Sequence, residues 1–156
     1  MLRLLTLLLF SLFTHSSTAA TILIVGDSLS AAYGLRMEDG WVALLQKAHP
    51  EHHWVNASIS GDTTQDGLGR LAEQLTLHEP DLLIIELGAN DGLRGLPVNL
   101  VSENLQQMIN QGKSLDARIL LLGIQIPSNY GPRYTQKFAN LYVELADKNR
   151  IGLVPF

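Results

Sequence analysis

An apolar run, Thr21-Ile22-Leu23-Ile24-Val25, leads directly into the turn Gly26-Asp27-Ser28-Leu29-Ser30. The run predicts a strand, and the glycine permits a sharp backbone turn where that strand ends. Such a turn presents a serine hydroxyl, and the backbone N–H groups after it are free to face negative charge on a substrate oxygen. Ser28 is therefore the candidate nucleophile. The alternative is an ordinary strand followed by a polar turn.

Beyond this turn the chain alternates between apolar runs and helical spacing. Further strands are predicted over residues 54–59, 81–87, 117–126 and 151–156. Asp39 is expected to cap a first helix over residues 40–48, and Gly112 to end the third. The four predicted helices have apolar faces formed by Trp41, Leu44, Leu45 and Ala48; by Leu68, Leu71, Ala72 and Leu75; by Val101, Leu105, Met108 and Ile109; and by Phe138, Leu141, Tyr142, Leu145 and Ala146.

This alternation predicts an α/β fold, a parallel sheet with helices on both faces, because right-handed crossovers leave few other topologies. Sites in such sheets form at the carboxyl ends of the strands. Three polar turns, residues 26–30, 60–64 and 88–92, follow the first three predicted strands. We therefore expect these turns to meet at one edge of the sheet.

The three turns also resemble the motifs of a known family. Gly-Asp-Ser-Leu-Ser at residues 26–30, a glycine at position 61 and Gly-x-Asn-Asp at residues 88–91 occur in the order found in SGNH or GDSL-type hydrolases. The resemblance extends from residue 21 to at least residue 95 and is strongest to the periplasmic thioesterase I/lysophospholipase (arylesterase) branch. It implies a flavodoxin-like three-layer α/β/α fold and a serine hydrolase of acyl esters and thioesters, with no cofactor.

The resemblance also implies roles for three residues. Ser28 would attack the acyl carbonyl, and its own N–H, the N–H of Gly61 and the side-chain amide of Asn90 would hold the oxyanion. The glycine lets the backbone approach the substrate, and an amide keeps its protons at any working pH. The alternative for Gly61 and Asn90 is turn chemistry alone. The classical α/β-hydrolase does not fit, because its Gly-x-Ser-x-Gly elbow would require a glycine where Ser30 stands.

Other polar residues in these turns have structural interpretations. Asp62 and Asp91 are expected to cap the helix or turn that follows each of them, and Asp27 to brace the nucleophile turn. Glu86 is expected to be a buried, hydrogen-bonded carboxyl group rather than a general base. The composition of Leu93, Arg94, Gly95 and Leu96 is that of a mobile lid that could gate an acyl chain, with a surface loop as the alternative.

A serine nucleophile needs a general base, which the family supplies from a late Asp-x-x-His motif that this chain lacks. The histidines are His15, His49, His52, His53 and His78. Those in the domain precede strands, so they are expected at the opposite edge of the sheet from Ser28. Their spacing does not suit zinc, and no metal is expected.

The chain ends inside a predicted core strand. We therefore expect a C-terminally truncated or frame-disrupted product that lacks a final helix and the Asp-x-x-His segment. Two functions follow. The first is ester and thioester hydrolysis, and the alternative is an inactive truncated product or an acyl- or anion-binding module without a general base.

Composition bounds the setting. The sequence has 156 residues, no cysteine, a formal net charge of −4 and no basic run, which disfavours nucleic acids and anionic membranes as partners. Arg3 followed by an apolar run and small residues predicts a signal peptide over residues 1–19, with a membrane anchor as the alternative. Residues 20–156 then form one domain, expected to be a periplasmic monomer without a membrane anchor that acts on a small acyl ester or thioester.

Overall fold

The computed structural model describes residues 19–156. The predicted signal peptide, including His15, lies almost entirely outside these residues. A parallel sheet of five strands forms the centre of the domain, in the order β2-β1-β3-β4-β5. The strands are β1 (Thr21–Gly26), β2 (His53–Asn56), β3 (Leu82–Glu86), β4 (Arg118–Leu122) and β5 (Gly152–Val154). This order is that of flavodoxin-like doubly wound sheets, as predicted.

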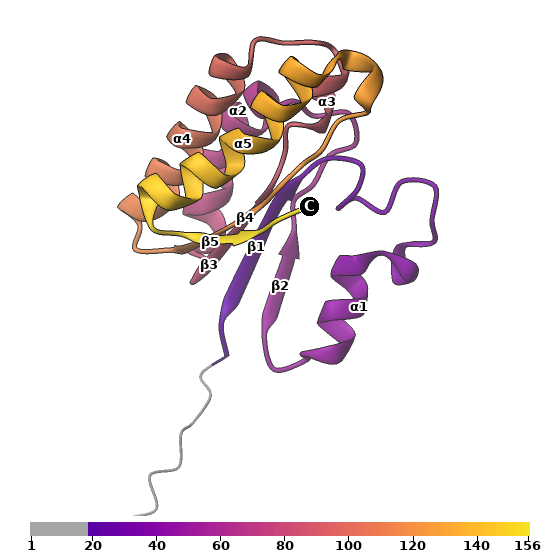
Figure 1. Ribbon diagram of the computed structural model, residues 1–156. Helices are drawn as coiled ribbons and strands as arrows, with labels where there is room; N and C mark the ends of the chain where they lie inside the picture. The colour runs from indigo at the N-terminus through magenta and orange to yellow at the C-terminus, as the bar shows by residue number, and fades with distance from the viewer. Residues whose placement is uncertain (1–18) are drawn as a thin grey trace, which may run out of the picture.

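Helices cover both faces of the sheet, but unequally. The helices are α1 (Trp41–Ala48), α2 (Thr64–His78), α3 (Ala89–Leu93), α4 (Val98–Ser114) and α5 (Pro132–Asn149), with short 3-10 turns at Met37–Asp39 and Ser128–Tyr130. Figure 1 shows α2, α4 and α5 grouped over one face and α1 alone over the other. None of the helices in residues 19–156 is both long enough and apolar enough to cross a membrane.

The strands supply a core on each face because successive side chains alternate between the two faces. In β1, Leu23 and Val25 pack in the larger cluster with α2, α4 and α5, whereas Ile22 and Ile24 pack in the smaller one with Val42 of α1. The predicted faces of α4 and α5 are confirmed, since all their members are buried. In β3, Leu83 and Ile85 pack in the larger cluster and Ile84 in the smaller one, so its apolar run is covered on both faces.

Two predicted helix faces were wrong in part. In α1, Leu44 is 53% exposed. The buried residue of this helix is Val42, because it packs within the smaller cluster. In α2, Ala72 is exposed, and Gly67 takes the inner position where the helix passes close to Leu87.

Predicted boundaries also needed correction. Asp39 does not cap α1; it lies in the preceding 3-10 turn and binds Arg36 with an Nε to Oδ2 distance of 2.8 Å. Helix α4 continues past Gly112, because this glycine allows close packing against Ile119 of β4 rather than a helix end. The second, fourth and fifth strands end earlier than predicted, at Asn56, Leu122 and Val154. Beyond the end of β2, the N–H groups of Ala57 and Ile59 still donate to carbonyls of β1.

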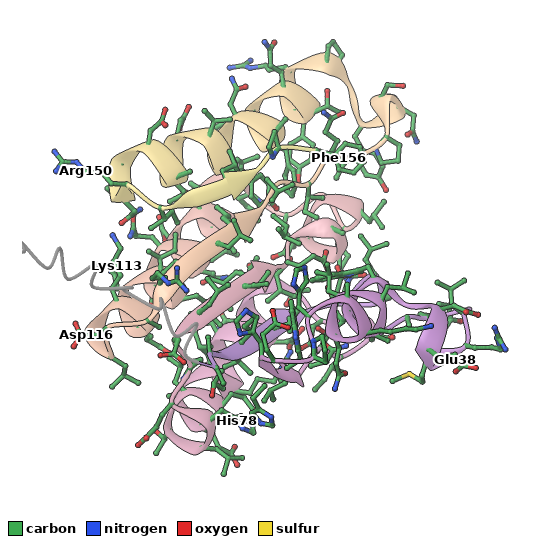
Figure 2. The ribbon with its side chains drawn as sticks, turned by 90° about the horizontal axis from the view of Figure 1, so that it is seen from below. Glu38, His78, Lys113, Asp116, Arg150 and Phe156 are labelled. Carbon is green, nitrogen blue, oxygen red and sulfur yellow. The ribbon has the colours of Figure 1, made fainter. Side chains whose placement is uncertain are left out.

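The two ends of the sheet are chemically different. Figure 2 shows Lys113, Asp116 and Arg150 at the edge where β4 and β5 begin, and Phe156 apart from them, beyond the end of β5. The polar turns after β1, β2 and β3 lie at the carboxyl edge, where the sequence predicted a site.

Candidate active site

Ser28 stands in a tight turn immediately after β1. The turn is closed by hydrogen bonds from the Ala31 N–H to the Asp27 carbonyl at 2.9 Å and from the Tyr33 N–H to the Ser28 carbonyl at 3.1 Å. The Asp27 side chain accepts the Leu29 N–H at 3.0 Å, so this residue braces the turn as predicted. Ser28 itself is half-buried and Leu29 is exposed. The serine hydroxyl is therefore at the surface of a well-bonded turn.

The side-chain amide of Asn90 joins the three predicted motifs. Its Nδ2 donates to the Asp62 carbonyl at 2.9 Å and to the Asp27 Oδ2 at 3.2 Å. Asp62 follows Gly61 in the second motif, and Asp27 precedes Ser28 in the first. The structure thus brings Ser28, Gly61 and Asn90 to one place, although they lie up to 62 positions apart along the chain.

Hydrogen-bond donors are available at this place. Among residues 19–156, no acceptor pairs with the backbone N–H of Ser28 or of Gly61. Gly61 is exposed and has a φ of 91°, a left-handed conformation that glycine adopts without strain. Both Asn90 amide hydrogens already have acceptors, and the longer bond is to Asp27. An oxyanion can take over that hydrogen more easily than the one bound to Asp62.

Asp62 and Asp91 do not cap the segments that follow them, so that prediction was wrong. Asp62 Oδ2 forms an ion pair with Arg70 at 2.8 Å, and the cap of α2 is Thr63. Asp91 is fully buried and accepts both the N–H and the hydroxyl of Thr64, at 2.8 and 2.7 Å. Asp91 therefore fixes the start of α2 against the turn that carries Asn90.

Residues 88–92 form more structure than the predicted turn. Gly88, with a φ of 124°, begins the short helix α3, and its Cα lies against the hydroxyl of buried Tyr142. Two glycines close together hid this helix in the sequence. Backbone hydrogen bonds from Gly92 to Gly88 and from Leu96 to Asp91 hold the two ends of α3. Asn90 therefore projects from a helix rather than from a loop.

The predicted lid, Leu93 to Leu96, is an exposed segment held by side chains from elsewhere in the chain. The Tyr130 hydroxyl donates to the Leu93 carbonyl at 2.7 Å, and the Tyr134 hydroxyl to the Leu96 carbonyl at 2.6 Å. Arg94 reaches the Gly61 carbonyl at 3.2 Å. These contacts were missed in the sequence, where the two tyrosines appear only as residues flanking the start of a helix.

An open cavity of about 480 Å³ begins at Pro97, directly after this segment. Its lining is mainly apolar and comes from the start of α4, from residues 130–134 and from Lys137. Tyr130 and Tyr134 line it while their hydroxyls hold the predicted lid. Ser28, Gly61 and Asn90 do not line this cavity, so it is separate from the place where the three motifs meet.

Glu86 is buried at the end of β3, as predicted. Its Oε2 accepts the Ser30 hydroxyl at 2.7 Å and the Asp27 N–H at 3.3 Å. Burial, followed by repulsion from the Asp27 carboxylate, raises the pKa of Glu86 to about 7. Burial also raises the pKa of Asp27. Two carboxyl groups, Asp27 within the nucleophile turn and Glu86 from β3, thus accept hydrogen bonds from this turn.

The described histidines lie away from Ser28. His52 Nδ1 accepts the N–H of Ala20, and His53 pairs with Thr21, both at the start of β1. His78 ends α2, before β3 begins, and Figure 2 shows it at the periphery. β1 is six residues long, so about 17–20 Å of strand separates its start from the nucleophile turn. Within residues 19–156, no three His, Cys, Asp or Glu side chains form a group suited to a metal ion.

Comparisons with known proteins agree with this geometry. Residues 24–156 match the model of the GDSL-like lipase/acylhydrolase family. The chain is 48% identical to esterase TesA of Pseudomonas aeruginosa over 93% of its length and 74% of the relative. It is 45% identical to an arylesterase of Vibrio mimicus, over its whole length and 80% of the relative.

Two further relatives extend the comparison. Thioesterase 1/protease 1/lysophospholipase L1 of Escherichia coli K12 is 44% identical over 91% of this chain and 69% of the relative. The crystal structure of the psychrotrophic esterase EstA from Pseudoalteromonas, inhibited by monoethylphosphonate, superposes with a TM-score of 0.84 at 44% identity. The superposition covers 88% of this chain and 77% of EstA. The fold is therefore shared with a solved esterase structure.

Proposed function

The chain belongs to the GDSL-like lipase/acylhydrolase family, and we propose on this premise that it hydrolyses acyl esters and thioesters through an acyl-enzyme on Ser28. Its relatives are named as esterases, an arylesterase and a thioesterase/lysophospholipase, which supports a serine hydrolase function. The observation that carries the proposal is the Asn90 amide, which contacts both the turn of Ser28 and the turn of Gly61.

In this mechanism the Ser28 Oγ attacks the acyl carbonyl carbon. A bond forms between Oγ and that carbon, negative charge develops on the carbonyl oxygen, and the bond to the alcohol or thiol then breaks. The oxyanion binds the N–H groups of Ser28 and Gly61 and the Asn90 amide. Removing one such donor typically costs about 3 kcal/mol of transition-state stabilisation. Water then hydrolyses the acyl-enzyme.

The Ser28 proton needs an acceptor, and no described histidine is near enough to take it. This observation favours a second function for the 156-residue chain, the binding of acyl groups or anions with little turnover. We expect its p-nitrophenyl ester hydrolysis to be lower by about 10²–10⁴-fold than that of a version extended after Phe156 with an Asp-x-x-His segment. Equal turnover by the two proteins would mean that another residue, such as Glu86, acts as the base.

The experiment that tests the nucleophile uses the extended protein and two variants. Ser28→Ala should reduce ester hydrolysis by more than about 10³-fold, and Asn90→Ala by about 10²–10³-fold. Both variants should keep the wild-type circular dichroism spectrum. Retention of more than about a tenth of the activity by Ser28→Ala would assign the reaction to another residue.

The predicted signal peptide and lid extend the proposal. Residues 1–19 direct export to the periplasm, and N-terminal sequencing should show that the exported protein begins near Ala20. Exported material that still began with Met1 would contradict export with cleavage.

Residues 93–96 contact the acyl chain of a small ester or thioester. Their position beside Gly61, through Arg94, supports this role. The protein is expected to act as a monomer and to need no cofactor.

A further inference from the structure

Glu86 is a buried titratable group that the proposed mechanism does not use. Its side chain is 3% exposed, and the fold surrounds it with the turn that presents Ser28. One carboxylate oxygen, Oε2, has two donors, whereas the other, Oε1, is buried without a hydrogen-bond partner among residues 19–156. Burying such a group costs free energy unless it stabilises something in return. Its two donors indicate what it stabilises.

Those donors lie on either side of the nucleophile. The Asp27 N–H is one residue before Ser28, and the Ser30 hydroxyl is two residues after it. Ser30 is 1% exposed, and its carbonyl also accepts the Asn56 side-chain amide at 2.8 Å. The short segment between the two donors contains only Ser28 and Leu29. A single oxygen atom therefore holds both ends of the segment that carries the nucleophile.

The surrounding backbone is shaped for this contact. Gly26 pairs with Glu86 in the register of β1 and β3. A Cβ on Gly26 would lie 2.7 Å from the Ser30 Oγ and 2.8 Å from the Glu86 Oε2. Both distances are shorter than real Cβ atoms show, so any other residue would push the carboxyl group and the hydroxyl apart. The glycine before the nucleophile thus makes room for a side chain of the neighbouring strand.

Glu86 also connects the nucleophile to the predicted oxyanion donor. It lies four residues before Asn90, and the bonded turn at Gly88 and helix α3 fix the intervening backbone. We propose that Glu86 is a positioning residue, which ties the turn of Ser28 to the end of β3 and so sets the place of Ser28 relative to the Asn90 amide. This inference rests on the proposed role of Ser28, and it adds a residue that touches neither substrate nor reacting atoms.

Charge at Glu86 bears on this role. Asp27 is the carboxylate that faces it most directly, while Asp62 and Asp91 act on Asp27, and the Tyr142 hydroxyl is influenced by Glu86, Asp27 and Asp91. Among residues 19–156, no cation pairs with Glu86. Because its pKa is raised to about 7, Glu86 is mostly the neutral acid below that pH, which suits a site where negative charge develops on a substrate oxygen.

The test compares three variants with wild type in the 156-residue chain and in the extended protein. Glu86→Leu removes the acceptor with little change in size, Ser30→Ala removes one donor, and Glu86→Gln keeps a neutral acceptor. Leu83→Ala is the matched control, because it is fully buried in the same strand and does not contact the nucleophile turn. The readouts are the amide NMR signals of Ser28 and Leu29, and the rate at which an alkyl fluorophosphonate labels Ser28.

Glu86→Leu should shift both amide signals and slow labelling by about 10–100-fold, since small displacements of a reacting group have effects of this size. Glu86→Gln should restore labelling to within about threefold of wild type, because it keeps the acceptor. Leu83→Ala should lower the unfolding midpoint while leaving the two signals and the labelling rate unchanged. Should Glu86→Leu fail to fold, Ser30→Ala supplies the same comparison with a smaller shift.

Unchanged amide signals and labelling in Glu86→Leu and Ser30→Ala would overturn the proposal. Equal effects of Leu83→Ala and Glu86→Leu would overturn it as well, because they would show a general loss of stability. If fluorophosphonate labels neither wild-type protein at Ser28, the proposed nucleophile fails. The amide signals still decide the positioning role in that case, so the two failures are distinguishable.

Discussion

Replacing Glu86 with glutamine should remove a pH dependence from the stability of the fold. The pKa of Glu86 is about 7 in the folded protein and close to its ordinary value of 4.5 when the chain unfolds. Between these values the folded state holds a proton that the unfolded state releases, so stability falls as pH rises. A pKa difference of this size corresponds to about 3 kcal/mol. This stabilisation is complete below about pH 4.5 and is lost above about pH 7.

The measurement is urea unfolding of wild type and Glu86→Gln between about pH 4.5 and about pH 8. The difference between their unfolding free energies should change by about 3 kcal/mol across this range, part of it through the Asp27 carboxyl group that Glu86 faces. Hydrogen bonds lower the pKa values of Glu51 and Asp66, which favours the fold at higher pH, but both proteins share that effect. Glu144→Gln, which changes an exposed glutamate on α5, is the control and should follow wild type. Parallel curves for wild type and Glu86→Gln would refute the reasoning.

Three further changes test contacts around the site. Asp91→Ala should lower the unfolding free energy by about 3 kcal/mol, measured in urea, because it leaves the buried N–H and hydroxyl of Thr64 without their acceptor; a loss below about 1 kcal/mol would contradict this. Gly88→Ala should cost about 2–4 kcal/mol in the same assay, since the backbone there has a φ of 124°, which a residue with a Cβ rarely adopts, and the added Cβ would meet the buried Tyr142 hydroxyl; wild-type stability would be the contrary result. Tyr130→Phe should accelerate hydrogen exchange in residues 93–96 by about threefold to tenfold, because the bond to the Leu93 carbonyl is lost, and unchanged exchange would show that this bond does not hold the segment.

The central part of the fold could be predicted because its signals are local. The runs that became β1 and β3 are mostly apolar, which is typical of parallel strands covered on both faces, and each leads into a glycine turn. The faces of α4 and α5 repeat with helical spacing and are buried as predicted. The meeting of the three turns that carry Ser28, Gly61 and Asn90 followed from the predicted parallel sheet, since parallel strands bring their carboxyl ends to one edge.

Features that depend on contacts between distant segments could not be predicted. The burial of Val42 in place of Leu44 depends on how α1 meets the smaller cluster, which the helical period does not determine. The short helix α3 follows from backbone bonds that two glycines concealed. The contact of Tyr130 with the predicted lid joins residues 37 positions apart. No pattern within a sequence window carries such information.

The end of β3 explains why one short segment determines so much of the site. β3 lies between β1 and β4, so its end is held by backbone bonds on both sides. Within six residues it supplies Glu86, which binds the nucleophile turn, Asn90, which contacts the first two motifs, and Asp91, which fixes the start of α2. Each contact ties a separate motif to the same rigid strand. A displacement of this segment would therefore move the predicted oxyanion donor and the nucleophile turn together, whereas loss of the Glu86 contact alone would let the nucleophile turn move independently of Asn90.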